Sequence, residues 1–156
     1  MALPEKHRAL RLTSTDEPLS VETLPTPQAG PGSAVVRVLF ANILSYSGDV
    51  YNGKRQYPLS LPLVPGTSAV GRVAAVGPDA TSLVVGALVI FDSFIRSRDN
   101  PNDAMLSGIL EGITQNSAKL MRGEWRDSTY AEYAKVRAWH SPTCLCANAA
   151  LRTDPA

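Results

Sequence analysis

The side chains that bind metals or carry out thiol chemistry are scarce in this sequence and lie near its two ends. It contains two histidines, His7 and His140, and two cysteines, Cys144 and Cys146. A zinc site needs three or four thiolate, imidazole or carboxylate ligands brought together, and this inventory makes such a site hard to assemble. The two cysteines, without companion ligands, are interpreted as unreactive thiols. The sequence therefore predicts no bound metal.

Side chains that could hold a phosphate are present but not segregated. Basic residues between positions 96 and 126 alternate with acidic ones, which is typical of a solvated, salt-paired surface. The formal net charge is +1, so the sequence argues against a nucleic-acid or anionic-membrane partner. Its longest apolar run, Leu83 to Phe91, is far shorter than a membrane span. No secretory signal is visible after Met1, so we expect a cytoplasmic protein.

The elements that must position any site are predicted to be mainly strands. The chain has 156 residues, of which 44% are hydrophobic and only 6% aromatic, enough for one packed domain. Glycine and proline recur between short β-branched runs, a pattern typical of a barrel or sandwich. We expect strands at residues 8–13, 20–24, 33–40, 66–77, 83–91 and 128–136.

Two predictions about elements carry particular weight. The run Ser33 to Phe40 is apolar on both faces apart from Arg37, which predicts a buried strand. Between Ala104 and Ile113 the apolar residues follow helical spacing, so we expect one or two short helices around residues 103–121. Beyond Val136 the sequence loses its period, and residues 137–156 are expected to form a divergent, unstructured tail.

Three segments occur in order along the chain: PTPQAGPGSAVVRVLFANI, PGTSAVGRVAAVG from Pro65, and STYAEYAKV from Ser128. Together they resemble the N-terminal, GroES-like domain of medium-chain alcohol dehydrogenases and quinone reductases. The run from Phe91 to Asp127 is most similar to a fungal branch of that superfamily. The resemblance covers residues 7–136 and implies a GroES-like distorted β-barrel.

The resemblance also implies a substrate and a cofactor. In such enzymes a hydride passes between NAD(P)H and a small-molecule carbonyl, alcohol or activated alkene, and a following Rossmann domain holds the nucleotide. No Gly-rich turn of that type follows Val136. We therefore expect NAD(P)H to serve a full-length relative but not to bind this chain alone, and we assign no cofactor-binding residue.

The resemblance places hydroxyl groups where zinc-dependent relatives carry a cysteine and a histidine ligand. The matching residues are Tyr46 and Thr67, which are poor zinc ligands, so we expect a zinc-independent site. Tyr46 and Ser47 become the candidate catalytic residues, because a neutral hydroxyl can donate to a developing oxyanion. Asp49 and Thr67 are the candidate substrate-pocket residues. The alternative is that Tyr46 packs its ring in the barrel mouth and that Asp49 supports a turn.

Three functions stay open at this point. The first is the substrate-binding domain of a zinc-independent reductase, inactive without a nucleotide domain. The second is a truncated, non-catalytic gene product, which the change of composition after Val136 favours. The third is a stand-alone module that binds a small molecule or a protein. Under each of them, an uncovered apolar surface predicts self-association.

Overall fold

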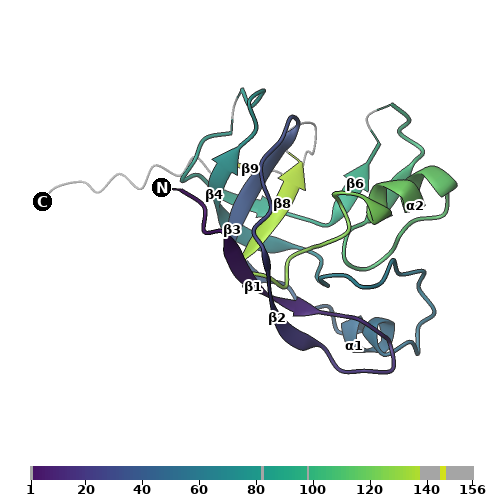
Figure 1. Cartoon of the computed structure of the whole chain (residues 1–156). Helices are drawn as coiled ribbons and strands as arrows, with labels where there is room; N and C mark the ends of the chain where they lie inside the picture. The colour runs from purple at the N-terminus through teal and green to yellow at the C-terminus, as the bar shows by residue number, and fades with distance from the viewer. Residues whose placement is uncertain (1, 82, 98, 138–144, 147–156) are drawn as a thin grey trace, which may run out of the picture.

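The computed structural model describes residues 2–81, 83–97, 99–137 and 145–146. It is built mainly from strands, with two short helices among the described residues (Figure 1). In chain order the elements are β1 (Lys6–Arg11), β2 (Ser20–Pro25), β3 (Ser33–Ala41), α1 (Ser47–Tyr51), β4 (Ala69–Val76), β5 (Leu88–Phe91), β6 (Phe94–Arg96), β7 (Ala104–Leu106), α2 (Gln115–Arg122), β8 (Tyr133–Arg137) and β9 (Leu145–Cys146). The predicted mainly-β fold with short helices is confirmed.

The largest sheet orders its strands β8-β3-β4-β5-β9, and every pair in it is antiparallel. β1 and β2 form a separate hairpin, and β6 pairs with β7. Isolated bridges tie the hairpin to the rest of the molecule, since Ala9 pairs with Ala131 and Leu12 pairs with Leu63. Figure 1 shows this hairpin running past the sheet towards α1.

Two apolar clusters form the core. One lies within the large sheet and includes Val36, Val73 and Val89. The other packs α1 and α2 against β6 and β7, with Val50 and Met121 both fully buried. Burial of each such side chain contributes about 1.5–3 kcal/mol. The second cluster fixes the position of α1.

The helix predicted between Ala104 and Ile113 is wrong. Ala104–Leu106 is strand β7, and the helix of this region, α2, begins only at Gln115. Gly108 and Gly112 have φ values of 75° and 85°, in the left-handed region that turns the chain and ends a right-handed helix. Ile113, placed on the apolar face by its spacing, is fully exposed.

β3 is buried along only half of its length. Residues 33–36 are buried as predicted, but Leu39 is 43% exposed and Phe40 is 74% exposed. The reason lies in the register, since β8 covers β3 only from Ser33 to Arg37. Beyond Arg37 the strand keeps β4 as its sheet neighbour and loses the cover of β8. The strand therefore carries an exposed apolar end.

α2 begins with a capping box. The Thr114 hydroxyl accepts a hydrogen bond from the Ser117 backbone N–H (3.0 Å), and the Ser117 hydroxyl accepts one from the Thr114 N–H (3.1 Å). The same Thr114 hydroxyl donates to the Asp103 carboxylate at 2.7 Å. Hydrogen bonds from Thr114, Asn116 and Asn100 lower the pKa of Asp103, so it stays charged at this helix end.

The predicted tail is described only in part. Arg137 ends β8, and Leu145–Cys146 pairs with β5 as β9. The rest of residues 138–156 lies outside the described residues. None of the described helices has the length and apolar character that crossing a membrane requires.

Candidate functional site

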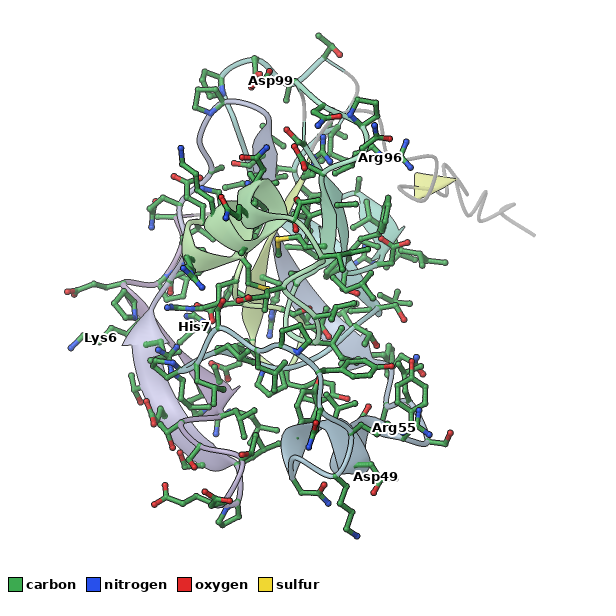
Figure 2. The ribbon with its side chains drawn as sticks, turned by 90° about the vertical axis from the view of Figure 1, so that its right-hand side faces the viewer. Lys6, His7, Asp49, Arg55, Arg96 and Asp99 are labelled. Atoms are coloured by element: carbon green, nitrogen blue, oxygen red, sulfur yellow. The ribbon has the colours of Figure 1, made fainter. Side chains whose placement is uncertain are left out.

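The segment from Tyr46 to Asp49 forms the start of α1. Tyr46 is the residue before the helix and is half-buried, with the Arg55 guanidinium 4.7 Å above its ring. This cation–π contact holds the ring in place. Asp49, in the first turn, accepts a hydrogen bond from the Arg55 backbone N–H through its own carbonyl (2.7 Å), and both residues lie at the α1 end of the molecule (Figure 2).

Ser47 lies on the inner face of α1. It is 4% exposed, and its hydroxyl has no hydrogen-bond partner. A buried hydroxyl without a partner costs about 1–3 kcal/mol, so such a group is rare unless a ligand or water satisfies it. Ser47 is therefore an available donor at the helix start.

Thr67 has the same property in a different loop. It is 7% exposed, and its hydroxyl also lacks a partner, although its backbone N–H donates to the Thr129 hydroxyl at 3.2 Å. The preceding residue, Gly66, has a φ of 126°, and a Cβ there would lie 2.3 Å from the Thr129 hydroxyl. Only glycine lets the loop approach Thr129 this closely.

Tyr51 connects α1 to the loop that contains Thr67. It lies one turn after Ser47 on the buried face of α1, and its hydroxyl accepts from the Gly66 N–H (3.0 Å) and donates to the Gly108 carbonyl (3.1 Å). Burial raises the pKa of Tyr51 to about 12, although the Gly66 hydrogen bond opposes this shift. The phenol therefore stays protonated and structural. Sequence analysis missed it, because both of its partners are backbone groups.

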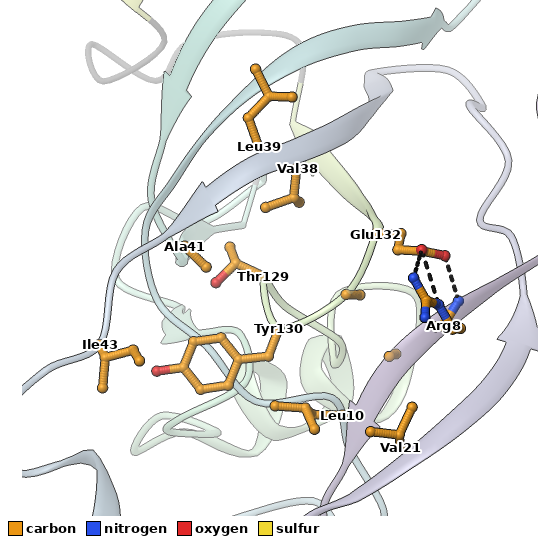
Figure 3. A pocket seen from close by; sticks show the side chains of 12 residues that line it. Arg8, Leu10, Val21, Val38, Leu39, Ala41, Ile43, Thr129, Tyr130 and Glu132 are labelled. Carbon is orange, nitrogen blue, oxygen red and sulfur yellow. Dashed lines mark hydrogen bonds and ion pairs between the residues drawn. The ribbon is translucent and has the colours of Figure 1, made fainter.

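An open, mainly apolar hollow of about 500 Å³ lies beside this region (Figure 3). Thr129 belongs to its lining, so the residue that holds the Thr67 backbone also faces the hollow. Tyr130 lines it as well, and its hydroxyl donates to the Asn42 carbonyl at 3.2 Å. Figure 3 shows Arg8 and Glu132 paired at one side of the hollow.

The four predicted site residues are thus placed in two connected groups. Tyr46, Ser47 and Asp49 lie at α1, and Thr67 lies in the loop that Tyr51 attaches to α1. None of the four lines the 500 Å³ hollow directly. Thr129 and Tyr130, which line this hollow, belong to the STYAEYAKV segment that carries the family resemblance, but the sequence pattern does not predict a role for either residue.

The donor set at these positions does not fit zinc. The groups that the resemblance matches to metal ligands are the Tyr46 phenol and the Thr67 hydroxyl, whereas zinc binds thiolate, imidazole or carboxylate. Within the described part of the chain, no three His, Cys, Asp or Glu side chains gather as a metal would require.

The fold is shared with solved alcohol dehydrogenases. A thermostable alcohol dehydrogenase from Pyrobaculum aerophilum superposes with a TM-score of 0.64 and 22% identity, over 85% of this chain and 39% of that one. A short chain alcohol dehydrogenase from E. coli CFT073, solved with its cofactor NADH, gives a TM-score of 0.66 and 22% identity, over 86% and 37% of the two chains. These similarities define the class of fold.

The sequence shows the family. Residues 30–144 match the alcohol dehydrogenase GroES-like domain, and the chain belongs to that family. The alcohol dehydrogenase notN of Aspergillus sp. (strain MF297-2) is 26% identical over 138 residues, which make up 88% of this chain and 39% of that protein. The chain thus spans about two fifths of the length of this relative.

Proposed function

We propose that this chain is the substrate-binding part of a zinc-independent, NAD(P)H-dependent oxidoreductase of the alcohol dehydrogenase or quinone reductase type. Its substrate class is a small carbonyl compound, alcohol or activated alkene. Family membership supports the class of reaction. The observation that carries the zinc-independent version is a pair of buried, unpartnered hydroxyls: Thr67, at a position that the resemblance matches to a metal ligand, and Ser47, next to Tyr46 at the other such position.

The chemistry follows from what a carbonyl needs as it is reduced. NAD(P)H, when bound, supplies the hydride, and negative charge then grows on the substrate oxygen. A donor fixed beforehand stabilises that charge without reorganising. Tyr46 is the first donor, since the Arg55 contact fixes its ring. Ser47 is the second, because no protein acceptor competes for its hydroxyl.

Thr67 and Asp49 shape the substrate pocket and take no part in proton transfer. The Thr67 hydroxyl is free to accept or donate to a polar group of the substrate, and its backbone is held by Thr129. Asp49 keeps the turn after α1 closed through its carbonyl bond to the Arg55 N–H. Because this bond uses the backbone carbonyl, it holds Arg55 beside the Tyr46 ring whichever side chain stands at position 49.

We assign none of these residues to binding the nucleotide cofactor. The sequence contains no G-x-G-x-x-G pattern of the kind that binds a dinucleotide, so we expect the chain alone to bind neither NADH nor NADPH and to turn over no substrate. Hydride transfer needs a nicotinamide held within reach of the reacting carbon.

The first experiment measures substrate binding by the chain itself. Saturation-transfer NMR with cinnamaldehyde, 2-cyclohexenone and benzyl alcohol should detect weak, saturable binding. Tyr46→Phe and Ser47→Ala should each weaken it severalfold, whereas the matched control Tyr57→Phe, outside the site, should not. Equal binding by all four proteins would contradict the assigned roles. Added NADPH should leave the spectra unchanged.

A second experiment concerns zinc. Metal analysis of the purified protein should find much less than one zinc per chain, and an added chelator should change neither ligand binding nor unfolding temperature. Stoichiometric zinc that leaves on chelation with loss of binding would overturn the zinc-independent version and leave the family assignment intact.

One observation favours a second function, a stand-alone binding module. The 500 Å³ hollow is of the size that takes a small molecule, and it is formed without any nucleotide domain. Under this function the ligand would protect the backbone amides of Thr129 and Tyr130 from hydrogen exchange. Under the oxidoreductase function the protected amides would be those of Ser47 and Thr67.

A further inference from the structure

The buried polar atoms that lack a partner fall into two groups, and only one belongs to the site above. Among the described residues they are His7 Nδ1, Thr26 Oγ1, Ser47 Oγ and Thr67 Oγ1. His7 and Thr26 lie together at one end of the β1–β2 hairpin, where His7 is paired with Leu24 and the Thr26 N–H donates to the Glu5 carbonyl at 3.0 Å. This second group has no role in the proposed reaction.

His7 lines a separate cavity of about 370 Å³. The cavity lies between the hairpin, the start of β8 and the segment that follows α2, and it shares only Ala131 with the apolar hollow. Its volume is within the range of small-molecule sites. None of Tyr46, Ser47, Asp49 or Thr67 lines it.

The His7 ring lies in the wall of this cavity and carries a nitrogen without a hydrogen-bond partner. The side chain is 6% exposed, its Nδ1 has no hydrogen-bond partner, and its nearest aromatic neighbour is Tyr133, edge-on with ring centroids 6.0 Å apart. Burial lowers the pKa of His7, against the opposing pull of the Glu132 and Asp127 carboxylates, so the ring is neutral near pH 7. A neutral imidazole offers one N–H donor and one acceptor.

The charges around the cavity do not balance. Its lining holds the cations Arg11, Arg126 and Lys135 but only two carboxylates, Glu124 and Asp127. Asp127 is shared between Arg126 at 3.2 Å and Arg11 at 3.8 Å, while Lys135 pairs with Glu124 at 2.7 Å. The Arg11 and Lys135 side chains are only 13% and 14% exposed. Three cations therefore share two carboxylates in a poorly hydrated place, and the net positive charge favours an anion there.

Apart from Ser128 and Tyr133, the remaining lining is apolar, and two prolines make part of it rigid. Pro25 and Pro27 stand on either side of Thr26, and Leu24, Val64 and Ala134 complete the wall. Prolines restrict the backbone, so the wall loses little conformational freedom when a ligand binds. A ligand that fits must combine one negative charge with a compact apolar body.

We propose that this cavity is a second small-molecule site, which binds a monocarboxylate with a compact apolar body. The carboxylate lies against His7 and the unbalanced positive charge of Arg11 and Arg126, and the apolar body lies against Pro25 and Pro27. The site is distinct from the proposed substrate site and does not depend on the proposed reaction.

The test uses benzoate as the probe and benzamide, its uncharged analogue, as the chemical control. NMR of the labelled chain follows the His7 ring signals and the indole N–H of Trp125, whose ring lies 5.8 Å from the Lys135 ammonium. Benzoate should shift both signals saturably at millimolar or lower concentration and raise the pKa of His7. Benzamide should bind at least tenfold more weakly.

Variants assign the binding to the cavity. His7→Phe and Arg11→Met should each weaken benzoate binding at least tenfold, and the second keeps the test valid if the first fails to fold. The matched control is Lys6→Met, because Lys6 precedes His7 on β1 but points into solvent (Figure 2). Equal binding of benzamide, unsaturable shifts, or unchanged affinity in both variants would each overturn the proposal.

Discussion

Arg8 and Glu132, 124 residues apart, are joined by four hydrogen bonds. The Arg8 backbone N–H and guanidinium donate to the Glu132 carboxylate at 2.8–3.1 Å, and the Glu132 N–H donates to the Arg8 carbonyl at 3.0 Å. The pair attaches β1 to the segment that enters β8, beside the apolar hollow. The first strand is thereby fixed to the last part of the barrel.

A double-mutant cycle of Arg8→Gln and Glu132→Gln should give a coupling free energy of about 0.5–1 kcal/mol in urea unfolding, because the guanidinium donates twice to one carboxylate oxygen but the pair is exposed. The hydrogen bonds from Arg8 lower the pKa of Glu132 below its ordinary value of 4.5. Its contribution to stability is therefore present above that value and is lost as the pH falls below it. The cycle of Glu132→Gln with Lys6→Gln, which do not contact each other, should give no coupling.

Tyr51→Phe should destabilise the protein by about 1–3 kcal/mol, since it leaves the Gly66 N–H and the Gly108 carbonyl without a partner. The pH dependence of the free energy of unfolding provides a second test. The pKa of Tyr51 rises from 10.0 to about 12 on folding, so the folded protein keeps a proton that the unfolded chain has lost. Its stability should fall as the pH rises between these values, and the variant should lack this fall. Urea unfolding from pH 9 upwards measures both effects.

Thr114→Ala should lower stability by about 1 kcal/mol, because it removes the cap of α2. It also removes the hydrogen bond to Asp103, so the pKa of Asp103 should rise towards its ordinary value. Thr114→Ser keeps the hydroxyl and should restore both properties. Thermal unfolding and carboxyl NMR titration provide the measurements, and a stable Thr114→Ala protein with an unshifted Asp103 would contradict the prediction.

Self-association through the exposed apolar end of β3 is expected to pair two copies of the chain. Phe40 is 74% and Ile43 is 76% exposed, and Ile43 lines the open hollow. Phe40→Ser and Ile43→Ser should shift sedimentation equilibrium towards monomer. Val84→Ser, at a 63% exposed position on another loop, is the control and should leave the equilibrium unchanged. A protein that is monomeric before any substitution would contradict this expectation.

Much of the fold could be predicted from residue patterns. The strands β1 to β4 lie close to their predicted positions because β-branched runs between glycine and proline report local preference. The helix between Ala104 and Ile113 could not be judged by spacing alone, since the left-handed glycines at 108 and 112 overrode it. The exposed end of β3 depended on where β8 stops, which is a property of tertiary pairing.

The site was predictable only as far as side-chain type goes. Tyr46, Ser47, Asp49 and Thr67 were found by their place in a familiar pattern, and the structure shows which of them are buried and unpartnered. The linking role of Tyr51 and the isolation of His7 arise from contacts between segments far apart in the chain. No local pattern carries that information.

The Tyr51 hydroxyl has a consequence for the order in which the molecule assembles. Its two partners lie 15 and 57 residues further along the chain, and closing loops of that length costs entropy before any contact repays it. The attachment of α1 to the Gly66 and Gly108 segments is therefore expected to form late in folding. A nascent polypeptide that has not yet emerged as far as Gly108 has no means of completing it.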